Sequence, residues 1–372
     1  MNGQPAQQSI APNSSQSPDF SGFKVGAKRL RQAMQGVPDR VPVYAQMHEF
    51  AMHSYGIPAD QFYTRADLLA QVNLEVAEKY GLDIGYVDYD VYNIEAEALG
   101  QKIVFPSGQM PDIDRSSYLI RDASDLPKIK TPHFDSDGRF PLVMEMQERY
   151  RQLTGLPPSL QFTAPFSLAA NLRGIEALLM DIHTNPQFAR GLFDAIVEEI
   201  LAPWIAYQQK HFPDASDIGG ADATASLPIV NPKILQEWVI PYILKLRELC
   251  GPGVYVPNWV GDRYMKQPEK MLALKLIVSP DFLEGQDPDV ATLGPSFYKS
   301  YAEAQDVALI LGVGAGFMAL NTPEDVRSRV KSYLEAGKPG GRFALYLCNL
   351  GATTPPENLT AAVQAVHDFG FY

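Results

Sequence analysis

Acidic and imidazole side chains stand close together in two short segments of the sequence. His48 and Glu49 are adjacent, and one residue separates Asp88 from Asp90. An imidazole beside a carboxylate can carry a proton or bind a metal. Two carboxylates at positions i and i+2 of a strand point to the same side, where mutual repulsion raises one pKa and suits that group to acid–base work. The structural alternative is a satisfied histidine and an aspartate that caps the next segment.

Other polar or aromatic residues follow short apolar runs, where their side chains can meet a substrate. For Asp222, Ser226 and Glu284 the alternative is that the side chain caps a loop or helix. The candidates after these runs are Asn171, Asp222, Ser226, Asn258, Asp262, Arg263, Glu284 and Phe317.

Cys348 is one of two cysteines in the chain, the other being Cys250. Two cysteines make no disulfide framework, which fits a reducing, cytoplasmic location. At the end of a strand, the Cys348 thiolate could bind a metal together with His48 or Glu284. No C-x-x-C or H-x-C pair accompanies it, so a small buried apolar side chain is the alternative.

Short apolar runs alternate with amphipathic stretches from about residue 40 to the end, which predicts eight strands, each followed by a helix. Eight such units favour an α/β fold of the (β/α)8 barrel type, in one domain with an insertion at 99–139 after the second strand. An open doubly wound sheet is the alternative, although G-x-G-x-G at 312–316 lacks dinucleotide-loop spacing. The strands are expected at 41–47, 84–89, 158–163, 217–221, 254–259, 276–280, 309–313 and 343–348.

The charge balance bears on possible partners. With 31 Lys and Arg against 43 Asp and Glu, the net charge of −12 makes nucleic acid an unsuitable partner. We also expect no membrane partner, because no apolar run approaches the roughly 20 residues that span a bilayer. Residues 1–24 are expected to form a disordered tail without a signal peptide. A homodimer is left open.

Five segments resemble one known family. They are D-R-V-P-V at 39–43, E-A-E-A-L-G at 95–100, A-P-F-S-L at 164–168, N-T-P-E-D-V at 321–326 and P-P-E-N at 355–358. In this order and spacing they resemble the uroporphyrinogen decarboxylase superfamily, which includes porphyrinogen decarboxylases and cobalamin-dependent methyltransferases. The resemblance implies a (β/α)8 barrel over residues 25–372, with its cleft at the carboxyl ends of the strands.

Departures from the family pattern separate its subgroups. Segment 44–50 has no arginine where the decarboxylases hold substrate carboxylates, and Asn171 and Ala352 replace their tyrosine and late histidine. The E-A-E-A-L-G and P-P-E-N segments look more like the methyltransferases. Their zinc-binding His-x-Cys becomes Asn258 and Val260 here, while Cys348 keeps its position. The usual zinc ligands are therefore incomplete, and only a rearranged site could bind zinc.

The resemblance therefore implies a methyltransferase that acts on a small methylated molecule, for example an aromatic methyl ether, with a corrinoid cofactor (cobalamin) on a partner protein. The alternatives are a decarboxylase, in which Asp90 stabilises a pyrrole nitrogen, and a catalytically silent ligand-binding barrel. The expected catalytic residues are His48, Asp88, Asp90 and Asn258. The expected binding residues are Glu49, Asn171, Asp222, Ser226, Trp259, Asp262, Arg263 and Phe317.

Overall fold

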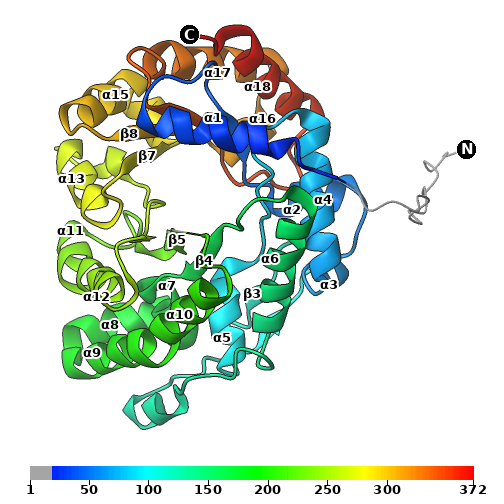
Figure 1. The fold of residues 1–372 in the computed structure, drawn as a ribbon. Coiled ribbons are helices and arrows are strands. Elements are labelled where there is room, and N and C mark those ends of the chain that lie inside the picture. The colour runs from blue at the N-terminus through cyan, green and yellow to red at the C-terminus, as the bar shows by residue number, and fades with distance from the viewer. Residues whose placement is uncertain (1–18, 216) are drawn as a thin grey trace, which may run out of the picture.

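Parallel strands form the inner layer of the structure, and helices surround them (Figure 1). The computed structural model describes residues 19–215 and 217–372. One parallel sheet has the order β1-β9-β8-β7 and another the order β4-β5-β6, while β2 and β3 form a short antiparallel pair. The strands are β1 Val43–Ala45, β2 Ile103–Val104, β3 Asp112–Ile113, β4 Leu160–Thr163, β5 Ile218–Ala221, β6 Val254–Tyr255, β7 Phe282–Gln286, β8 Ala308–Val313 and β9 Phe343–Leu347.

Helices connect the strands in chain order and cover their outer faces. The helices are α1 Phe23–Gln35, α2 His48–Ser54, α3 Ala59–Phe62, α4 Ala66–Tyr80, α5 Ile94–Ala98, α6 Phe140–Thr154, α7 Pro165–Arg173, α8 Ile175–Thr184, α9 Pro186–Ala195, α10 Ala202–His211, α11 Pro232–Ile234, α12 Ile240–Cys250, α13 Pro268–Val278, α14 Asp289–Leu293, α15 Pro295–Ala304, α16 Ala315–Leu320, α17 Pro323–Gly337 and α18 Pro356–Phe369. Within residues 19–215 and 217–372, no helix is long and apolar enough to cross a lipid bilayer.

The segment expected as a strand at 84–89 lies between β1 and β4 without forming a ladder. At its start the Asp83 amide donates to the Val43 carbonyl at 2.8 Å, and just beyond it the Thr163 hydroxyl donates to the Val91 carbonyl at 2.7 Å. The segment therefore occupies the second of the eight barrel positions, held by contacts at its two ends rather than by a regular strand pairing.

The predicted strand at 276–280 is wrong. These residues finish helix α13, and the strand comes later, as β7. The cause is the apolar run M-L-A-L-K-L-I-V at 271–278, whose periodicity does not separate a buried helix from a buried strand. Met271, Leu272 and Val278 are all buried in the helix that this run forms.

Helix α1 covers the amino-terminal end of the barrel. Its Leu30 and Met34 pack against a cluster of buried side chains that point inward from β8 and β9, including Ile310 and Ala344. The close approach of α1 requires Gly26, since a Cβ there would lie 1.7 Å from the Asp83 carbonyl oxygen. In Figure 1 this helix crosses the strands. Only the carboxyl end of the barrel is thus left open to a substrate.

The expected disordered tail at 1–24 extends too far into the chain. Phe20 is 3% exposed, and its backbone N–H donates to the Leu153 carbonyl at 2.9 Å. Phe20 therefore anchors the chain to α6, and Phe23 and Lys24 already belong to α1. The remainder of the predicted tail lies outside the described residues.

Two of the sequence motifs have local structural roles. In N-T-P-E-D-V the Thr322 hydroxyl accepts from the Asp325 N–H at 3.2 Å, and the Asp325 carboxylate accepts from the Thr322 N–H at 3.1 Å. This capping box fixes the start of α17. In E-A-E-A-L-G the Glu95 carboxyl accepts from the Thr163 N–H at 2.9 Å and lies 2.6 Å from the Thr163 hydroxyl, which fastens α5 to β4.

Candidate active site

Asp88 is at the centre of a hydrogen-bonded chain at the carboxyl end of the barrel. Its Oδ1 accepts from Gln46 Nε2 at 3.3 Å, and its Oδ2 accepts from the backbone N–H of His48. The Tyr346 hydroxyl donates in turn to Gln46 Oε1. Asp88 is 3% exposed, and burial raises its pKa against the opposing effects of His48 and these donors. A carboxyl placed in this way holds a proton more readily than an exposed one.

His48 and Tyr63 each carry a buried polar atom without a partner. Neither His48 Nε2 nor the Tyr63 hydroxyl has a hydrogen-bond partner among the described residues, although both atoms are buried. His48 Nε2 lies 3.7 Å from Asp88 Oδ2. His48 also has a φ of +34°, a strained backbone conformation for a residue with a side chain. Buried polar atoms without partners and strained backbone are both typical of functional sites.

The insertion after the second barrel position reaches this mouth. The Met110 N–H donates to Glu49 Oε1 at 3.2 Å, and the Met110 sulfur contacts the His48 ring. The insertion is anchored on its far side by Arg173, whose guanidinium donates to the Arg121 carbonyl. A loop held in this way can exclude water from His48 and Asp88.

Inside the barrel, below the mouth, the inward-facing strand positions carry tyrosines. The rings of Tyr44 and Tyr346 are stacked with centroids 5.0 Å apart, and Tyr255 packs edge-on against Phe282 at 5.5 Å. Tyr44 and Tyr255 are half-buried although they lie at the centre of the fold. The lumen of the barrel therefore keeps accessible surface, and its wall is aromatic.

Tyr86 completes this wall from the unpaired segment between β1 and β4. Its hydroxyl accepts from Gln161 Nε2 on β4. Burial, followed by nearby Asp88 and the tyrosines, raises the pKa of Tyr86 well above its ordinary value. Burial likewise raises the pKa of Tyr44, Tyr255 and Tyr346, so all four side chains remain neutral phenols.

Glu284 lies at the base of this lumen. Gln286, Gly312, Tyr346 and Tyr44 are in register across β7, β8, β9 and β1. Glu284 comes two residues before Gln286 on β7, so it lies below the Tyr44–Tyr346 stack, toward the amino-terminal end of the barrel. Its carboxylate accepts from Gln286 Nε2, and burial raises its pKa. Lys275 donates to the backbone carbonyl of Glu284 at 3.3 Å rather than to its carboxylate.

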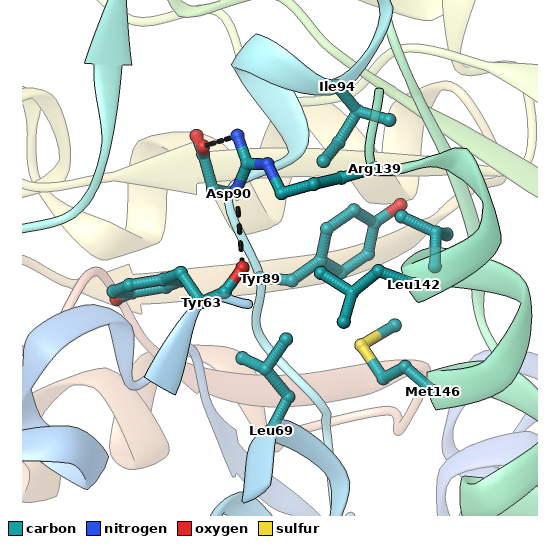
Figure 2. Close-up of a pocket in the computed structure, with 9 residues that line it drawn as sticks. Tyr63, Leu69, Tyr89, Asp90, Ile94, Arg139, Leu142 and Met146 are labelled. Atoms are coloured by element: carbon teal, nitrogen blue, oxygen red, sulfur yellow. Dashed lines mark hydrogen bonds and ion pairs between the residues drawn. The ribbon is translucent and has the colours of Figure 1, made fainter. Parts of the chain in front are cut away.

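Asp90 is in a different environment from Asp88 (Figure 2). Its Oδ2 accepts from Arg139 Nη2 at 2.7 Å, its Oδ1 accepts from Asn93 Nδ2, and Arg139 also pairs with Glu97. The surrounding pocket has no room for a water molecule. Burial raises the pKa of Asp90 to about 7, with Arg139 opposing the shift. The prediction that repulsion between Asp88 and Asp90 tunes one of them is therefore wrong, because burial is the largest cause for each.

Comparison with known families agrees with this architecture. The family model described as uroporphyrinogen decarboxylase (URO-D) matches residues 26–369. The chain belongs to this family. A solved methyltransferase from Methanosarcina mazei superimposes with a TM-score of 0.73 at 19% identity, covering 95% of this chain and 99% of that one. The predicted superfamily and the predicted (β/α)8 class are both confirmed.

Curated relatives of this URO-D protein have two different names. A methylated-thiol–coenzyme M methyltransferase from Methanosarcina mazei is 25% identical over 308 residues, which cover 80% of this chain and 75% of the relative. A uroporphyrinogen decarboxylase from Anaeromyxobacter dehalogenans is 23% identical over 327 residues, covering 82% and 86%. The match to both subgroups leaves the activity to be argued from the site.

The residues of this URO-D protein do not fit the zinc that the methyltransferase subgroup implies. Across residues 19–215 and 217–372, no group of three or more His, Cys, Asp or Glu is close enough to hold a metal. Cys348 is 2% exposed, and burial raises its pKa well above the ordinary value. Because a metal-binding cysteine must be a thiolate, Cys348 has the wrong electrostatic environment.

Asn171 and Asn258, two of the predicted site residues, meet at Tyr92. Asn171 Nδ2 donates to the Tyr92 carbonyl at 2.7 Å, and Asn258 Nδ2 donates to the Tyr92 hydroxyl at 3.0 Å. Asn258 Oδ1 also accepts from the Asp222 N–H at 3.0 Å. Both asparagines therefore position Tyr92 and the end of β5.

Asp222 itself is fully buried in a ring of donors. Its carboxylate accepts from the N–H and hydroxyl of Ser167 at 3.0 and 2.9 Å and from Trp259 Nε1 at 3.2 Å. Burial raises its pKa to about 6. Ser226 accepts from the Val260 N–H at 3.1 Å. Asp222, Ser226 and Trp259 thus join the loops after β4, β5 and β6 to one another.

The last predicted binding residues are also engaged within the protein. Asp262 pairs with Lys275 at 2.8 Å, and Arg263 pairs with Asp289 at 2.6 Å. The ring of Phe317 lies beneath the guanidinium of Arg329 at 3.9 Å from the ring centroid. These contacts shape the rim of the barrel.

Sequence reasoning missed most of the residues that line the lumen. It considered the polar residues that follow each strand and overlooked Tyr44, Gln46, Tyr86, Tyr255 and Tyr346 within or beside the strands. A signal was present: Tyr44 with Gln46, Tyr86 with Asp88, and Tyr346 with Cys348 are polar or aromatic at i and i+2. This alternation is typical of the inner face of a barrel strand.

Proposed function

We propose that this URO-D protein is a methyltransferase that moves a methyl group between a small methylated molecule and a corrinoid on a partner protein. The observation that carries the proposal is the acidic mouth. Asp88 and Glu49 are both there, and no Lys or Arg within the described residues forms an ion pair with either carboxylate. Such a mouth repels a substrate with several carboxylates and accepts a neutral or cationic one.

The arginines that a decarboxylase would use for substrate carboxylates are already paired. Arg173 pairs with Asp181 at 2.7 Å, and Arg263 pairs with Asp289. Arg139 is held between Asp90 and Glu97. Releasing any of them to a substrate would leave a buried or half-buried carboxylate unpaired, which costs several kcal/mol. The similarity to a methylated-thiol methyltransferase also supports methyl transfer.

His48 and Asp88 are proposed to hold and move the proton at the group that loses the methyl. His48 Nε2 has no hydrogen-bond partner among residues 19–215 and 217–372 and lies 3.7 Å from the Asp88 carboxylate. The carboxylate can stabilise an imidazolium, so the pair can donate a proton to a leaving atom. Glu49 and Met110 keep the loop of the insertion over this pair and limit the access of water.

The rim of the mouth fits a partner that carries a large flat cofactor. Ile229, Tyr264 and Leu320 are 52%, 52% and 86% exposed, and they belong to the segments after β5, β6 and β8. Exposed apolar side chains around a cleft are typical of interaction surfaces. These residues would contact the corrinoid protein, whose bound corrinoid would supply the nucleophile that takes the methyl group.

Methyl transfer to a corrinoid protein tests the proposal directly. The purified protein is mixed with a reduced corrinoid protein and a panel of methylated donors, and methylation is followed by the visible spectrum of the corrinoid. We expect catalysed methylation with at least one donor and no conversion of uroporphyrinogen. Efficient formation of coproporphyrinogen would instead show a decarboxylase. Ligand binding without either reaction would show a silent barrel.

A further inference from the structure

The aromatic wall of the lumen is suited to a cation with an apolar surface. Tyr44 stacks on Tyr346 at 5.0 Å, Tyr86 bonds to Gln161 on β4, and Tyr44 and Tyr255 keep part of their surface accessible inside the ring of strands. Each ring face carries a partial negative charge from its π-electrons. Aromatic cages of this kind recognise methylated ammonium groups, which are too large and too weakly hydrated to need hydrogen bonds.

Carboxyl groups stand at both ends of the same space. Glu284 lies at the base and Asp88 at the mouth, and the stacked Tyr44 and Tyr346 lie between their levels. In the described part of the chain, neither carboxyl forms an ion pair with Lys or Arg. The nearest base, Lys275, is bound to the Asp262 carboxylate. The lumen therefore holds two carboxyl groups that no Lys or Arg of the described residues neutralises, and a bound cation would favour their ionised form.

We infer that this lumen binds a small methylated ammonium ion and that this ion is the methyl donor. The inference rests on the proposed methyl transfer and names its substrate class. The four tyrosines hold the N-methyl groups, Glu284 compensates the charge from below, and one methyl faces His48 and Asp88 at the mouth. An aromatic methyl ether, which the sequence suggested, gains less from two carboxyl groups because it carries no charge.

The chemistry of such a donor balances without a metal at the leaving atom. The C–N bond breaks and its electron pair stays on nitrogen, so the donor becomes a neutral amine. The methyl carbon forms its new bond with an electron pair from the nucleophile of the corrinoid partner. The amine lone pair then accepts the proton held by His48 and Asp88, and the amine leaves as an ammonium ion. A neutral amine needs no Lewis acid to leave.

Equilibrium binding to the full chain tests this inference without any corrinoid protein. Choline and 3,3-dimethyl-1-butanol have nearly the same shape, but only choline is charged. Calorimetric titration should give choline a dissociation constant at least about tenfold lower than that of the neutral alcohol, in buffer of fixed ionic strength. Equal binding of the two, or tighter binding of the alcohol, would overturn the inference.

Variants assign the effect to the lumen. Glu284→Gln keeps the shape of the side chain and should weaken choline binding about tenfold while leaving the alcohol unaffected. Tyr346→Leu should weaken choline binding by a similar factor, whereas Tyr44→Phe keeps the ring and should bind nearly as the parent does. Glu335→Gln removes an exposed carboxylate, 65% accessible, as the matched control. Loss of choline binding in Glu335→Gln alone would contradict the assignment.

The two proposals fail in different ways. If choline does not bind but an aromatic methyl ether methylates the corrinoid partner, the methyltransferase stands and the ammonium donor is wrong. If choline binds with the expected selectivity but no methylated ammonium ion transfers a methyl group, the ammonium donor is also wrong. Methylation of the corrinoid by a choline-type donor, lost in Glu284→Gln, would establish both.

Discussion

Buried carboxylates in two regions of this barrel have opposite kinds of partner. Outside the lumen, Asp90 is paired with Arg139, and Asp262 with Lys275. Inside the lumen and at its mouth, Asp88 and Glu284 accept hydrogen bonds from amide groups of glutamines and the backbone. The carboxylates of the first group are committed to the fold. Those of the second group have no Lys or Arg partner among the described residues and can ionise when a cationic ligand binds beside them.

The difference has an energetic basis. A buried ion pair adds little net stability, but removal of one partner strands a charge in a medium of low dielectric constant. A buried carboxyl with neutral donors instead shifts its pKa upward and stays protonated until a cation arrives. Substitution should therefore damage the fold in the first region and the function in the second.

The largest expected effect is on stability, at Arg139. Arg139→Met should lower the free energy of unfolding by about 3 to 5 kcal/mol, because both Asp90 and Glu97 lose their partner. Urea unfolding followed by circular dichroism measures the change. Arg115→Met removes an arginine from an exposed pair with Asp112 and should change stability by about 0.5 kcal/mol or less. A similar, small loss in both variants would break the comparison.

The second prediction concerns Glu95, which is buried with neutral donors only. Burial raises its pKa from 4.5 to about 7. A raised pKa favours the protonated carboxyl in the folded state, so this contribution to stability is present below pH 4.5 and is lost as pH rises through 7. Glu95→Gln cannot ionise. Its free energy of unfolding relative to the parent should therefore rise by about 2 to 3 kcal/mol between pH 5 and pH 8.

Unfolding curves of the parent and Glu95→Gln at several pH values check this sign. Asp90 and Asp222 also have raised pKa values, but they are present in both proteins and cancel in the difference. A stability difference that stays constant across this pH range would mean that Glu95 is ionised in the fold.

The third prediction is functional. Asp88→Asn and His48→Ala should each lower the rate of methyl transfer by roughly 10²-fold, as expected for a positioned proton carrier. Asp90→Asn provides the comparison, since its carboxyl is bonded to Arg139 and Asn93. We expect it to lower stability while the folded fraction keeps activity within about tenfold of the parent. A 10²-fold loss in folded Asp90→Asn would restore the catalytic role that its sequence position suggested.

The sequence predicts the frame of this molecule better than its site. The apolar runs at β8 and β9 locate two central strands, because both are buried on each face and flanked by turns. Segment 271–278 misleads because a wholly apolar run fits either a helix or a strand. Segment 84–89 was predicted to be a strand, but it forms no hydrogen-bonded ladder with its neighbours. Hydrogen bonds near its two ends hold it in place instead.

The partners of the site residues are long-range and so cannot be inferred from local pattern. Asp90 and Arg139 are 49 residues apart, and Gln46 and Tyr346 are 300 apart. Position at the end of a strand correctly indicated that Asp88 and His48 meet. The same criterion treated Asp88 and Asp90 alike. In the fold, however, Asp88 lies beside His48, whereas Asp90 forms an ion pair with Arg139.

The smallest expected effect is at Cys348, which lies in the lumen one level nearer the mouth than Tyr346. A Cβ on Gly312 would meet its sulfur at 2.4 Å, so the thiol is packed against β8. Burial and the nearby carboxyl of Glu284 both raise its pKa, which keeps it protonated and unreactive. Cys348→Ala should therefore change methyl transfer by about threefold or less, and it should leave the zinc content of the purified protein unchanged. Elemental analysis of both proteins checks the second statement. Stoichiometric zinc that disappears in Cys348→Ala would show that the lumen binds a metal after all. The Cys348 thiolate would then join Asp88 and Glu284 as a group that is available to a ligand.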